Sequence, residues 1–474
     1  MNAVKYVYLS TIGCQMNVYD SERMVRELAG RGYVTTPVLE KADLVLVNTC
    51  TIRAKAEQKA FSFLGRLRRL KHQKPALVVG VGGCVAQQEG EKILRRMPWV
   101  DLVFGPQAIG RLPGHVQRIE AQGGPVVDID LTAAAPEEKR PSTQGAGDGV
   151  TRFVTIMRGC DNFCSYCVVP HVRGREASRH PDDILDEIRG LVASGVREVT
   201  LLGQNVNSYG QKEGLCAFPE LLARIDALDG LWRIRFTTSH PKDLSDELIG
   251  AFGRLGKLCR HIHLPVQSGS DRVLNRMNRK YSRQHYLARI ANLRRACPDI
   301  AISTDIIVGF PGETREDFNE TLSLIKTVEY DSLFAFQYSD RPQVPAVRFA
   351  DKVPLQDGAD RLQELLGLQE RYTLRNNQRL VGGCEPILVE GLSKKQDRRR
   401  PAVPNQPPQW TGRTTSNKIV NFLPAEADSI PGAALTGKMV TVRIEKALAH
   451  SLRGTQVQPT AAPSAVKGDA NHAA

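Results

Sequence analysis

Three cysteines in one short segment have the spacing of ligands for an iron–sulfur cluster. Cys160, Cys164 and Cys167 lie in the stretch MRGCDNFCSYCVVP, spaced C-x3-C-x2-C, and the only further candidate ligand close behind them is His171. Structural zinc and iron–sulfur clusters normally take four protein ligands. A cubane held by three thiolates keeps one iron open for a second molecule, as a catalytic zinc keeps an open position. The alternatives are a zinc site completed by a distant residue and cysteines that only pack in a core.

A second set of three cysteines is spread over the first hundred residues. Cys14, Cys50 and Cys84 each directly follow an apolar run, in VYLSTIGC, LVLVNTC and VVGVGGC. The carboxyl ends of parallel strands meet along one edge of a sheet, where α/β proteins bind their ligands. A single cysteine is often a core residue, but three in equivalent positions predict a second cluster with three thiolate ligands. Gly13 and the pair Gly82–Gly83 would let the backbone approach such a cluster closely.

The segments around the second set predict a parallel α/β domain over residues 1–118. Continuous apolar runs alternate there with helical patterns, which is typical of strands buried on both faces. Residues 119–150 are rich in Ala, Gly, Pro and charged residues and are expected to form a linker.

The same alternation recurs six times over residues 151–345, in a domain that we expect to span 151–377. The apolar runs are FVTIM, EVTLLG, WRIRFTT, HIHLPV, AISTDIIVG and SLFAFQY. Six βα units predict a partial (βα)6 barrel of the TIM kind, whose chemistry lies at the carboxyl ends of the strands. Polar or glycine residues follow several of these runs. Core packing does not require such residues at strand ends, whereas a functional site at this end of the barrel does require them.

The C-terminal part is predicted to be a small β-barrel over residues 378–448, followed by a disordered tail over 449–474. Residues 378–425 carry eight Lys or Arg against three Asp or Glu, including Lys394–Lys395 and Arg398–Arg400. Such a run is either a solvated surface or a face that contacts phosphates. The stretch DRRRPAVPNQPPQW at 397–410 has the look of a loop insertion.

Composition indicates a soluble, cytoplasmic protein that can attract polyanions. The chain of 474 residues has a formal net charge of +13, and nucleic acid is the commonest polyanionic partner of a basic protein. Neither a signal peptide nor a run of about 18 apolar residues is evident, so no membrane association is expected. Ten cysteines in such a chain favour metal binding over disulfides. The four outside the two sets are read as packing or surface thiols: Cys216, Cys259, Cys297 and Cys384.

The first cysteine motif, with Tyr166 before the third cysteine and a place after the first strand of a βα barrel, resembles the radical S-adenosylmethionine (SAM) superfamily. The three-domain order resembles its methylthiotransferase family, whose third domain is a TRAM-like RNA-binding barrel. The likeness is carried by GCQMNVYDSERM at 13–24, VNTCTIRAKAEQK at 47–59, GCVAQQEG at 83–90, RGREASR at 173–179 and QSGSDRVLNRMNR at 267–279.

This resemblance implies an enzyme with two [4Fe–4S] clusters and SAM as cofactors. It assigns Cys160, Cys164 and Cys167 to the radical-generating cluster, and Cys14, Cys50 and Cys84 to an auxiliary cluster that carries the sulfur. It also implies that the cofactor is held at the strand ends by Gly203, Gln204, Ser239 and Gln267, with no catalytic side chain beyond the cluster cysteines. Asp305 and Arg175 are candidates for orienting the substrate.

Within the family, LLGQNVNSYG at 201–210 and GRTTSNKIVNF at 412–422 are most similar to the members that modify tRNA beside the anticodon. The implied reaction adds a methylthio group to C2 of N6-isopentenyladenosine, giving 2-methylthio-N6-isopentenyladenosine. The implied partners are the tRNA anticodon stem-loop, an electron donor such as flavodoxin or ferredoxin, and an Fe–S or sulfur donor protein. The enzyme is expected to be a monomer.

Three other functions remain open from the sequence. The first is a methylthiotransferase acting on N6-threonylcarbamoyladenosine of tRNA, the second is a relative that modifies an aspartate of a ribosomal protein, and the third is a non-catalytic Fe–S RNA-binding protein. The segment YSDRPQVPA at 338–346 departs from the family, because Gln343 and Val344 stand where Gly-Thr is usual. This departure leaves the detail of the substrate pocket open.

Overall fold

The structure is a computed structural model that describes residues 4–51, 54–131, 149–393, 408–425 and 435–458. It divides into two compact units, Met1–Gln369 and Glu370–Ala474. The division falls inside a long helix, α13 (Leu355–Gln378), and so lies a few residues before the predicted boundary at 377. None of the helices in the described part of the chain is long and apolar enough to span a membrane.

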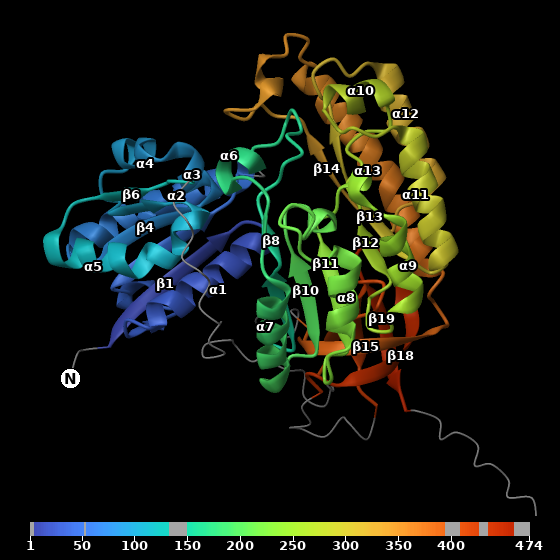
Figure 1. Ribbon diagram of the computed structural model, residues 1–474, viewed down its shortest axis with the longest axis horizontal. Helices are drawn as coiled ribbons and strands as arrows, with labels where there is room; N and C mark the ends of the chain where they lie inside the picture. The colour runs from blue at the N-terminus through green and yellow to red at the C-terminus, as the bar shows by residue number, and fades with distance from the viewer. Residues whose placement is uncertain (1–3, 52–53, 132–148, 394–407, 426–434, 459–474) are drawn as a thin grey trace, which may run out of the picture. The chain divides into compact units, whose positions relative to one another are not determined.

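The N-terminal domain is a six-stranded parallel sheet between two layers of helices (Figure 1). The strand order is β2-β1-β3-β4-β5-β6. The strands are β1 (Lys5–Ile12), β2 (Tyr33–Thr35), β3 (Leu44–Thr49), β4 (Val78–Gly83), β5 (Leu102–Phe104) and β6 (Val126–Asp128). The helices are α1 (Gln15–Ala29), α2 (Ala54–Gln73), α3 (Cys84–Glu89), α4 (Glu91–Arg96) and α5 (Leu112–Gln122), with 3-10 turns η1 (Leu39–Lys41) and η2 (Pro106–Arg111).

Strands β3 and β4 are buried along their whole length, which explains their unbroken apolar sequence. Alternate residues of β3 enter different cores, so that Leu44 and Leu46 pack with α1 and α5. Val45 and Val47 pack with α2 and α4 on the opposite face. The predicted α/β architecture of this domain is confirmed.

The predicted linker at 119–150 is wrong over its first residues. Helix α5 continues to Gln122, and β6 pairs in parallel with β5 through Leu102–Val126 and Phe104–Asp128. The Gly-rich composition of residues 122–125 marks a turn between α5 and β6, not the end of the domain. Only 132–148 lie outside the described residues.

The second domain of the first unit is a six-stranded, open parallel βα barrel. Two three-stranded sheets, β7-β10-β11 and β12-β13-β14, are joined where Leu258 bridges to Ile234 of β11. The strands are β7 (Thr151–Thr155), β10 (Glu198–Leu202), β11 (Arg233–Thr237), β12 (His261–His263), β13 (Ala301–Val308) and β14 (Ser332–Gln337), and a short hairpin pairs β8 (Met157–Arg158) with β9 (Ala177–Ser178). The predicted partial barrel is confirmed.

Helices cover the outer face of this barrel, as Figure 1 shows for α8, α9, α11 and α12. The helices are α6 (Val169–Arg173), α7 (Pro181–Ala193), α8 (Phe218–Asp226), α9 (Asp246–Arg254), α10 (Asp271–Arg276), α11 (Arg283–Ala296) and α12 (Arg315–Val328), with turns η3 (Val206–Ser208), η4 (Pro241–Asp243) and η5 (Pro345–Arg348). Ser245, Ser270, Ser282 and Thr314 cap the starts of α9, α10, α11 and α12 through their side chains.

The second unit contains a closed five-stranded β-barrel with the order β15-β16-β17-β19-β18. Its strands are β15 (Cys384–Leu392), β16 (Trp410–Arg413), β17 (Ile419–Leu423), β18 (Met439–Ala447) and β19 (Leu452–Val457). The predicted small barrel is confirmed, but the predicted boundary of the tail at 449 is wrong. Strand β19 closes the barrel between β17 and β18, because Leu452 and Gly454 point into the core. The tail from 459 onward, Lys394–Lys395 and Arg398–Arg400 lie outside the described residues.

Candidate functional site

The N-terminal sheet brings Cys14, Cys50 and Cys84 to one edge. Strand register pairs Ile12 with Thr49 and Thr49 with Gly83, so the three central strands β1, β3 and β4 end side by side. Each cysteine follows its strand end by one or two residues. The backbone is tightly packed here, since a Cβ on Gly13 would lie 2.8 Å from Cβ of Cys50. The structure therefore assembles the predicted auxiliary set.

Two fully buried asparagines fix the loops that carry these cysteines. The Asn17 carboxamide oxygen accepts from the backbone N–H of Cys14 at 3.2 Å and from its thiol at 3.4 Å. The Asn17 amide group donates to Asn48 Oδ1 at 2.9 Å and to the carbonyl of Thr49 at 3.1 Å. Asn48 in turn donates to the carbonyl of Asn17 at 2.8 Å and to Ser21 at 2.9 Å. This network ties the end of β1 to the end of β3.

The thiols of this set differ in their electrostatic surroundings. A hydrogen bond with Cys50 and the nearby positive charge of Arg173 outweigh burial and lower the pKa of Cys14 to about 6. Burial raises the pKa of Cys84, although Arg173 opposes that shift. Thiolates are the metal-binding form of cysteine. With its pKa lowered to about 6, the Cys14 side chain is mostly a thiolate at neutral pH.

The barrel loop between β8 and α6 brings Cys160, Cys164 and Cys167 together. The start of the loop requires a glycine at position 159. Gly159 has φ +75, and a Cβ there would lie only 1.9 Å from the carbonyl oxygen of Arg175. Burial raises the pKa of Cys160 to about 11 and that of Cys167 to about 12. These two thiols are therefore neutral without a metal, and their ionisation would have to be coupled to binding one.

A buried arginine that sequence reasoning missed lies against the central cysteine of this loop. Arg279 donates to Cys164 Sγ at 3.4 Å, to the carbonyl of Pro265 at 2.6 Å and to the Tyr281 hydroxyl at 3.0 Å. A fourth contact joins it to the Tyr166 hydroxyl at 3.4 Å. Arg279 is the last residue of QSGSDRVLNRMNR, so that motif was a signal, but nothing in its spacing identified a contact to Cys164.

The residues expected to hold SAM lie at the carboxyl ends of β10, β11 and β12. Gly203 directly follows β10, and a Cβ there would lie 2.5 Å from Met157 Cγ. Gln204 accepts from the N–H of Gly159 at 2.5 Å, which ties this strand end to the cysteine loop. Gln267 has φ +74 and bridges to Ile306 of β13.

Several buried polar atoms at these strand ends have no hydrogen-bond partner among the described residues. They include Gln204 Nε2, Ser239 Oγ and His240 Nε2, at strand ends that the sequence predicted to be polar, together with Thr155 Oγ1 and Asn207 Oδ1, which sequence reasoning did not single out. A buried polar group without a partner costs about 1–3 kcal/mol. Such groups are expected where a polar ligand completes the site, and SAM carries the ammonium, carboxylate and ribose hydroxyls that would satisfy them.

The cysteine sets are not arranged to hold a single metal ion. Among the residues that the structure describes, no three His, Cys, Asp or Glu side chains converge closely enough to hold one ion. The ligands of a four-iron cubane bind different iron atoms, so they need not converge on one point. All ten cysteines are described and none is in a disulfide. Each trio offers the three thiolates that a [4Fe–4S] cubane with one open iron would take.

The two cysteine sites are neighbours within the first unit. Cys84 packs in one buried cluster with Val168 and Val172, which follow the radical-site motif, and with Val344. The departure at 343–344 therefore lies beside the auxiliary set. Gln343 has φ +70, a conformation that favours glycine, which accounts for the usual Gly at this position.

The two residues considered for orienting the substrate have partners of their own. Arg175 pairs with Asp161 at 3.0 Å, and its guanidinium lies 4.9 Å from the ring centroid of Phe163. Both partners belong to the cysteine loop. Asp305 lies 3.4 Å from His263 Nε2 on the adjacent strand. Neither contact tests a role toward a substrate.

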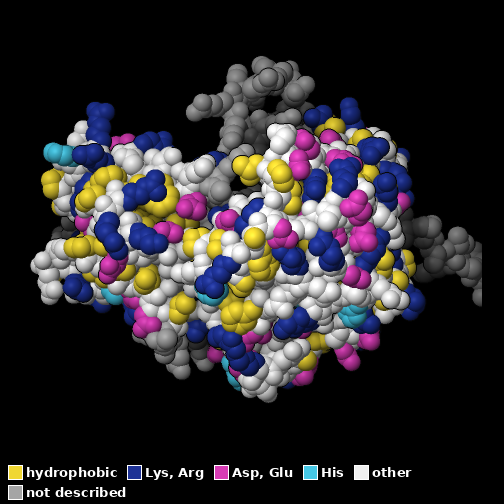
Figure 2. Space-filling model, turned by 90° about the horizontal axis from the view of Figure 1, so that it is seen from above, with side chains coloured by type: hydrophobic (Ala, Val, Ile, Leu, Met, Phe, Trp, Pro, Cys, Tyr) yellow, Lys and Arg dark blue, Asp and Glu magenta, His cyan; other side chains and the backbone are white. Residues whose placement is uncertain are grey.

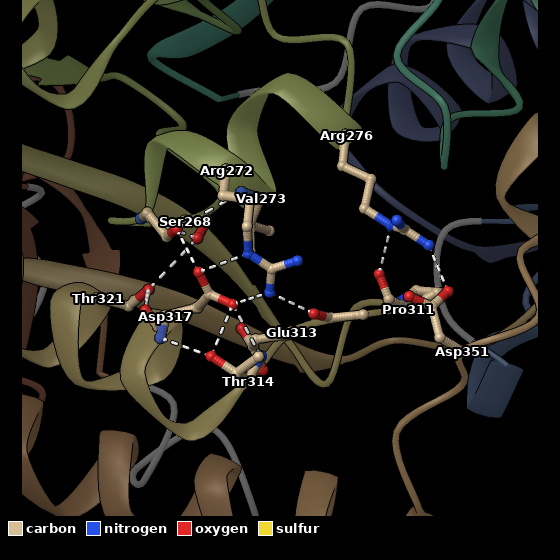
Figure 3. A network of polar contacts seen from close by, with 12 residues as sticks. Ser268, Arg272, Val273, Arg276, Pro311, Glu313, Thr314, Asp317, Thr321 and Asp351 are labelled. Carbon is tan, nitrogen blue, oxygen red and sulfur yellow. Dashed lines mark hydrogen bonds and ion pairs between the residues drawn. The ribbon is translucent and has the colours of Figure 1, made fainter.

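A polar network supports the loops after β12 and β13 (Figure 3). Asp317 accepts from the backbone N–H of Thr314, the N-cap of α12, at 2.8 Å and from Ser270 at 2.6 Å, and it pairs with Arg272. Arg276, one helical turn further along α10, donates to the carbonyl of Pro311 at 2.9 Å and pairs with Asp351. Ser165 of the cysteine loop donates to the carbonyl of Arg276 at 2.9 Å, so this network is connected to the cysteine loop.

Comparison with known proteins matches both domains of the first unit. Residues 6–105 match a family described as "Uncharacterized protein family UPF0004", and residues 154–325 match the radical SAM superfamily. The radical SAM methyltransferase TsrM from Kitasatospora setae, solved with tryptophan and a SAM analogue, covers 72% of this chain and 75% of its own with a TM-score of 0.55 and 15% identity. At that identity the likeness concerns the fold alone.

Full-length relatives are much more similar. The tRNA-2-methylthio-N(6)-dimethylallyladenosine synthase of Desulfosudis oleivorans is 57% identical over 96% of this chain and 97% of its own. The protein of that name from Geobacter metallireducens is 51% identical over 96% of this chain and 99% of its own. These findings confirm the resemblance drawn from the motifs. The chain belongs to the family of tRNA-2-methylthio-N(6)-dimethylallyladenosine synthases, which are radical SAM methylthiotransferases.

Proposed function

We propose that this enzyme adds a methylthio group to C2 of N6-isopentenyladenosine, beside the anticodon of tRNA, using two [4Fe–4S] clusters and SAM. The observation that carries this proposal is the adjacency of two cysteine trios, each at the carboxyl edge of a parallel sheet and packed together through Cys84, Val168 and Val172. When bound, the clusters would pass on the electron that cleaves the sulfonium of one SAM and would carry the sulfur that is transferred, while SAM would supply the radical that removes the C2 hydrogen and, from a second molecule, the methyl group.

The chain's own residues hold and enclose these groups. Cys160, Cys164 and Cys167 bind one cluster, and Cys14, Cys50 and Cys84 bind the other. Gln204, Ser239 and Gln267 are proposed to bind SAM, and Gly203 is proposed to contact it through its backbone, since Met157 occupies the space of a Cβ there. Arg279 orients Cys164. Three of the six ligands, Cys50, Cys84 and Cys164, are buried, which limits the access of water to them.

The surface of the N-terminal domain suits a nucleic-acid partner. Arg66 stacks over Phe63, Arg68 over Trp99, and Arg96 over Phe61 with 4.3 Å between the guanidinium and the ring centroid. In the described part of the chain none of these arginines is paired with a carboxylate. Figure 2 shows Lys and Arg side chains lying among hydrophobic ones on this domain. The rings of Phe61, Phe63 and Trp99 pack against the core, and the guanidinium groups held over them can contact phosphates at the surface.

The remaining partners follow from the chemistry. An electron must come from outside the chain, from a donor such as flavodoxin or ferredoxin, and an Fe–S or sulfur donor protein must restore the transferred sulfur. We expect the enzyme to act as a monomer.

The test uses the anaerobically reconstituted full chain with dithionite, SAM and an isopentenylated anticodon stem-loop. We expect 2-methylthio product by mass spectrometry, release of 5′-deoxyadenosine and about eight irons per chain, as two four-iron clusters require. Cys50→Ala should abolish product and halve the iron, whereas the matched control Cys384→Ala, at an exposed thiol, should change neither. Product formation only on a threonylcarbamoylated stem-loop would overturn the substrate assignment. Full activity of Cys50→Ala would overturn the auxiliary site.

A further inference from the structure

One arginine belongs to the radical-site segment but reaches the auxiliary site. Arg173 is the last residue of α6, six positions after Cys167. Its guanidinium donates to Asp20 Oδ2 of α1 at 2.6 Å, and both side chains are more than nine-tenths buried. Val172, the residue before Arg173, packs against Cys84, and the positive charge of Arg173 counteracts the burial that raises the pKa of Cys84. One buried cation of the radical-site segment therefore lies beside the auxiliary set.

Both ends of the radical loop contact the same residue of the N-terminal domain. Gln107, which is buried in η2, donates to the carbonyl of Arg173 at 2.9 Å. Its carboxamide oxygen accepts from Arg158 at 2.8 Å, at the other end of the loop. These contacts hold both ends of the radical loop, including the backbone of Arg173, against the N-terminal domain.

The two charges of the pair are not equivalent toward the auxiliary thiols. Arg173 acts electrostatically on both Cys14 and Cys84, and it is the largest charged influence on each. Asp20 acts on Cys84 in the opposite sense and more weakly. The net field at the auxiliary set is therefore positive, but Asp20 partly offsets it.

We propose that Arg173 is a positioning residue that holds the auxiliary site against the radical site and whose charge raises the reduction potential of the auxiliary cluster. The inference rests on the proposed function, because it takes Cys14, Cys50 and Cys84 to hold a cluster. Reduction adds negative charge to a cluster, so a buried cation nearby stabilises the reduced state. Net charge and hydrogen bonds to the ligand sulfurs are established determinants of cluster potential.

The test isolates the auxiliary cluster in the full-length chain by combining Cys160→Ala, Cys164→Ala and Cys167→Ala. Midpoint potentials are measured by a redox titration followed by electron paramagnetic resonance, together with iron content. We expect Arg173→Met to shift the midpoint to a lower potential and Asp20→Asn to shift it to a higher one. The double variant should fall between the two, and Arg173→Lys should lie nearer to the parent than Arg173→Met.

A merely structural salt bridge predicts a different pattern, because breaking it from either side would disturb the site in the same way. Shifts of the same sign in Arg173→Met and Asp20→Asn, or no shift in either, would therefore overturn the proposal. If Arg173→Met fails to retain iron, Asp20→Asn decides alone, and an unchanged or lowered midpoint would overturn it.

A matched control is Arg235→Met. Arg235 is buried and bonds Glu198 at 2.9 Å, but Glu198 is the first residue of β10, at the end of the strand away from the cysteines. Its midpoint should equal that of the parent. If the parent itself binds no cluster, the proposed function fails. That outcome is distinct from a bound cluster whose midpoint potential does not change when Arg173 is replaced.

Discussion

Replacing Gly83 by alanine should destroy the auxiliary site, because neither the backbone conformation nor the space at this position admits a Cβ. Gly83 ends β4 directly before Cys84 and has φ +93 and ψ −162, a region that is essentially restricted to glycine. A Cβ there would lie 2.4 Å from the carbonyl oxygen of Thr49 and 2.4 Å from Asn48 Oδ1. The obstructing atoms are a backbone carbonyl in the neighbouring strand and a side chain fixed by the Asn17–Asn48 network, so neither can move cheaply.

The magnitude follows from two contributions. Holding a non-glycine residue in such a conformation costs about 1–3 kcal/mol. Overpacking against a fixed neighbour costs a further ~1–3 kcal/mol. The sum of about 2–6 kcal/mol is a large part of the ~5–15 kcal/mol that stabilises a typical domain. The chain can relieve it only by separating the ends of β3 and β4, which carry Cys50 and Cys84.

The assay compares Gly83→Ala with Gly32→Ala in the same domain. Gly32 has a similar φ of +81, but a Cβ there would meet nothing within 4 Å, so this variant measures the backbone cost alone. Urea unfolding should show a larger loss of stability for Gly83→Ala, and its iron content should fall by about half, to the single cluster that the radical site would still hold. Equal unfolding midpoints for the two variants, with full iron in Gly83→Ala, would refute the reasoning.

Three further expectations concern the barrel. Arg279→Met leaves Cys164 and the hydroxyls of Tyr166 and Tyr281 without their donor, so it should cost about 2–4 kcal/mol in urea unfolding and remove the radical-site iron while the auxiliary iron stays; retention of all iron would contradict the role given to Arg279. Ser239→Ala removes a buried hydroxyl that has no partner, so it should raise the unfolding free energy of the SAM-free protein by about 1–3 kcal/mol but weaken SAM binding about 10-fold, or about 1.4 kcal/mol; unchanged affinity by calorimetry would place Ser239 outside the cofactor site. Burial opposes ionisation of Asp317, but hydrogen bonds from Arg272, Ser270 and Thr314 outweigh it and lower its pKa to about 2. Because the folded-state pKa lies below the ordinary 3.8, the ionised carboxylate adds about 1–2 kcal/mol of stability above pH 4 that is lost as the pH falls toward 2. The difference in unfolding free energy between the parent and Asp317→Asn should therefore shrink over that window, and a constant difference would argue against the assigned charge state.

The sequence by itself determined the features that depend on short spacing and on strand pattern. C-x3-C-x2-C needs no partner far along the chain to be recognised, because the loop that carries it is local. The second trio was also predictable, since an apolar run followed by a cysteine repeats three times and parallel strands end at a common edge. The polar strand ends that include Gln204 and Ser239 followed from the same rule for βα barrels.

Only the tertiary structure decided which distant side chains complete these sites. Arg279 lies 115 residues from Cys164, and Arg173 lies 153 residues from Asp20. No periodicity links such pairs, because their contact depends on how whole domains fold and pack. The same holds for β6 and β19, whose short segments have weak strand signals and become strands because the neighbouring strands offer unpaired backbone groups. The ligand cysteines can be recognised from the order of residues, whereas the buried arginines that lie beside them are brought there by the fold.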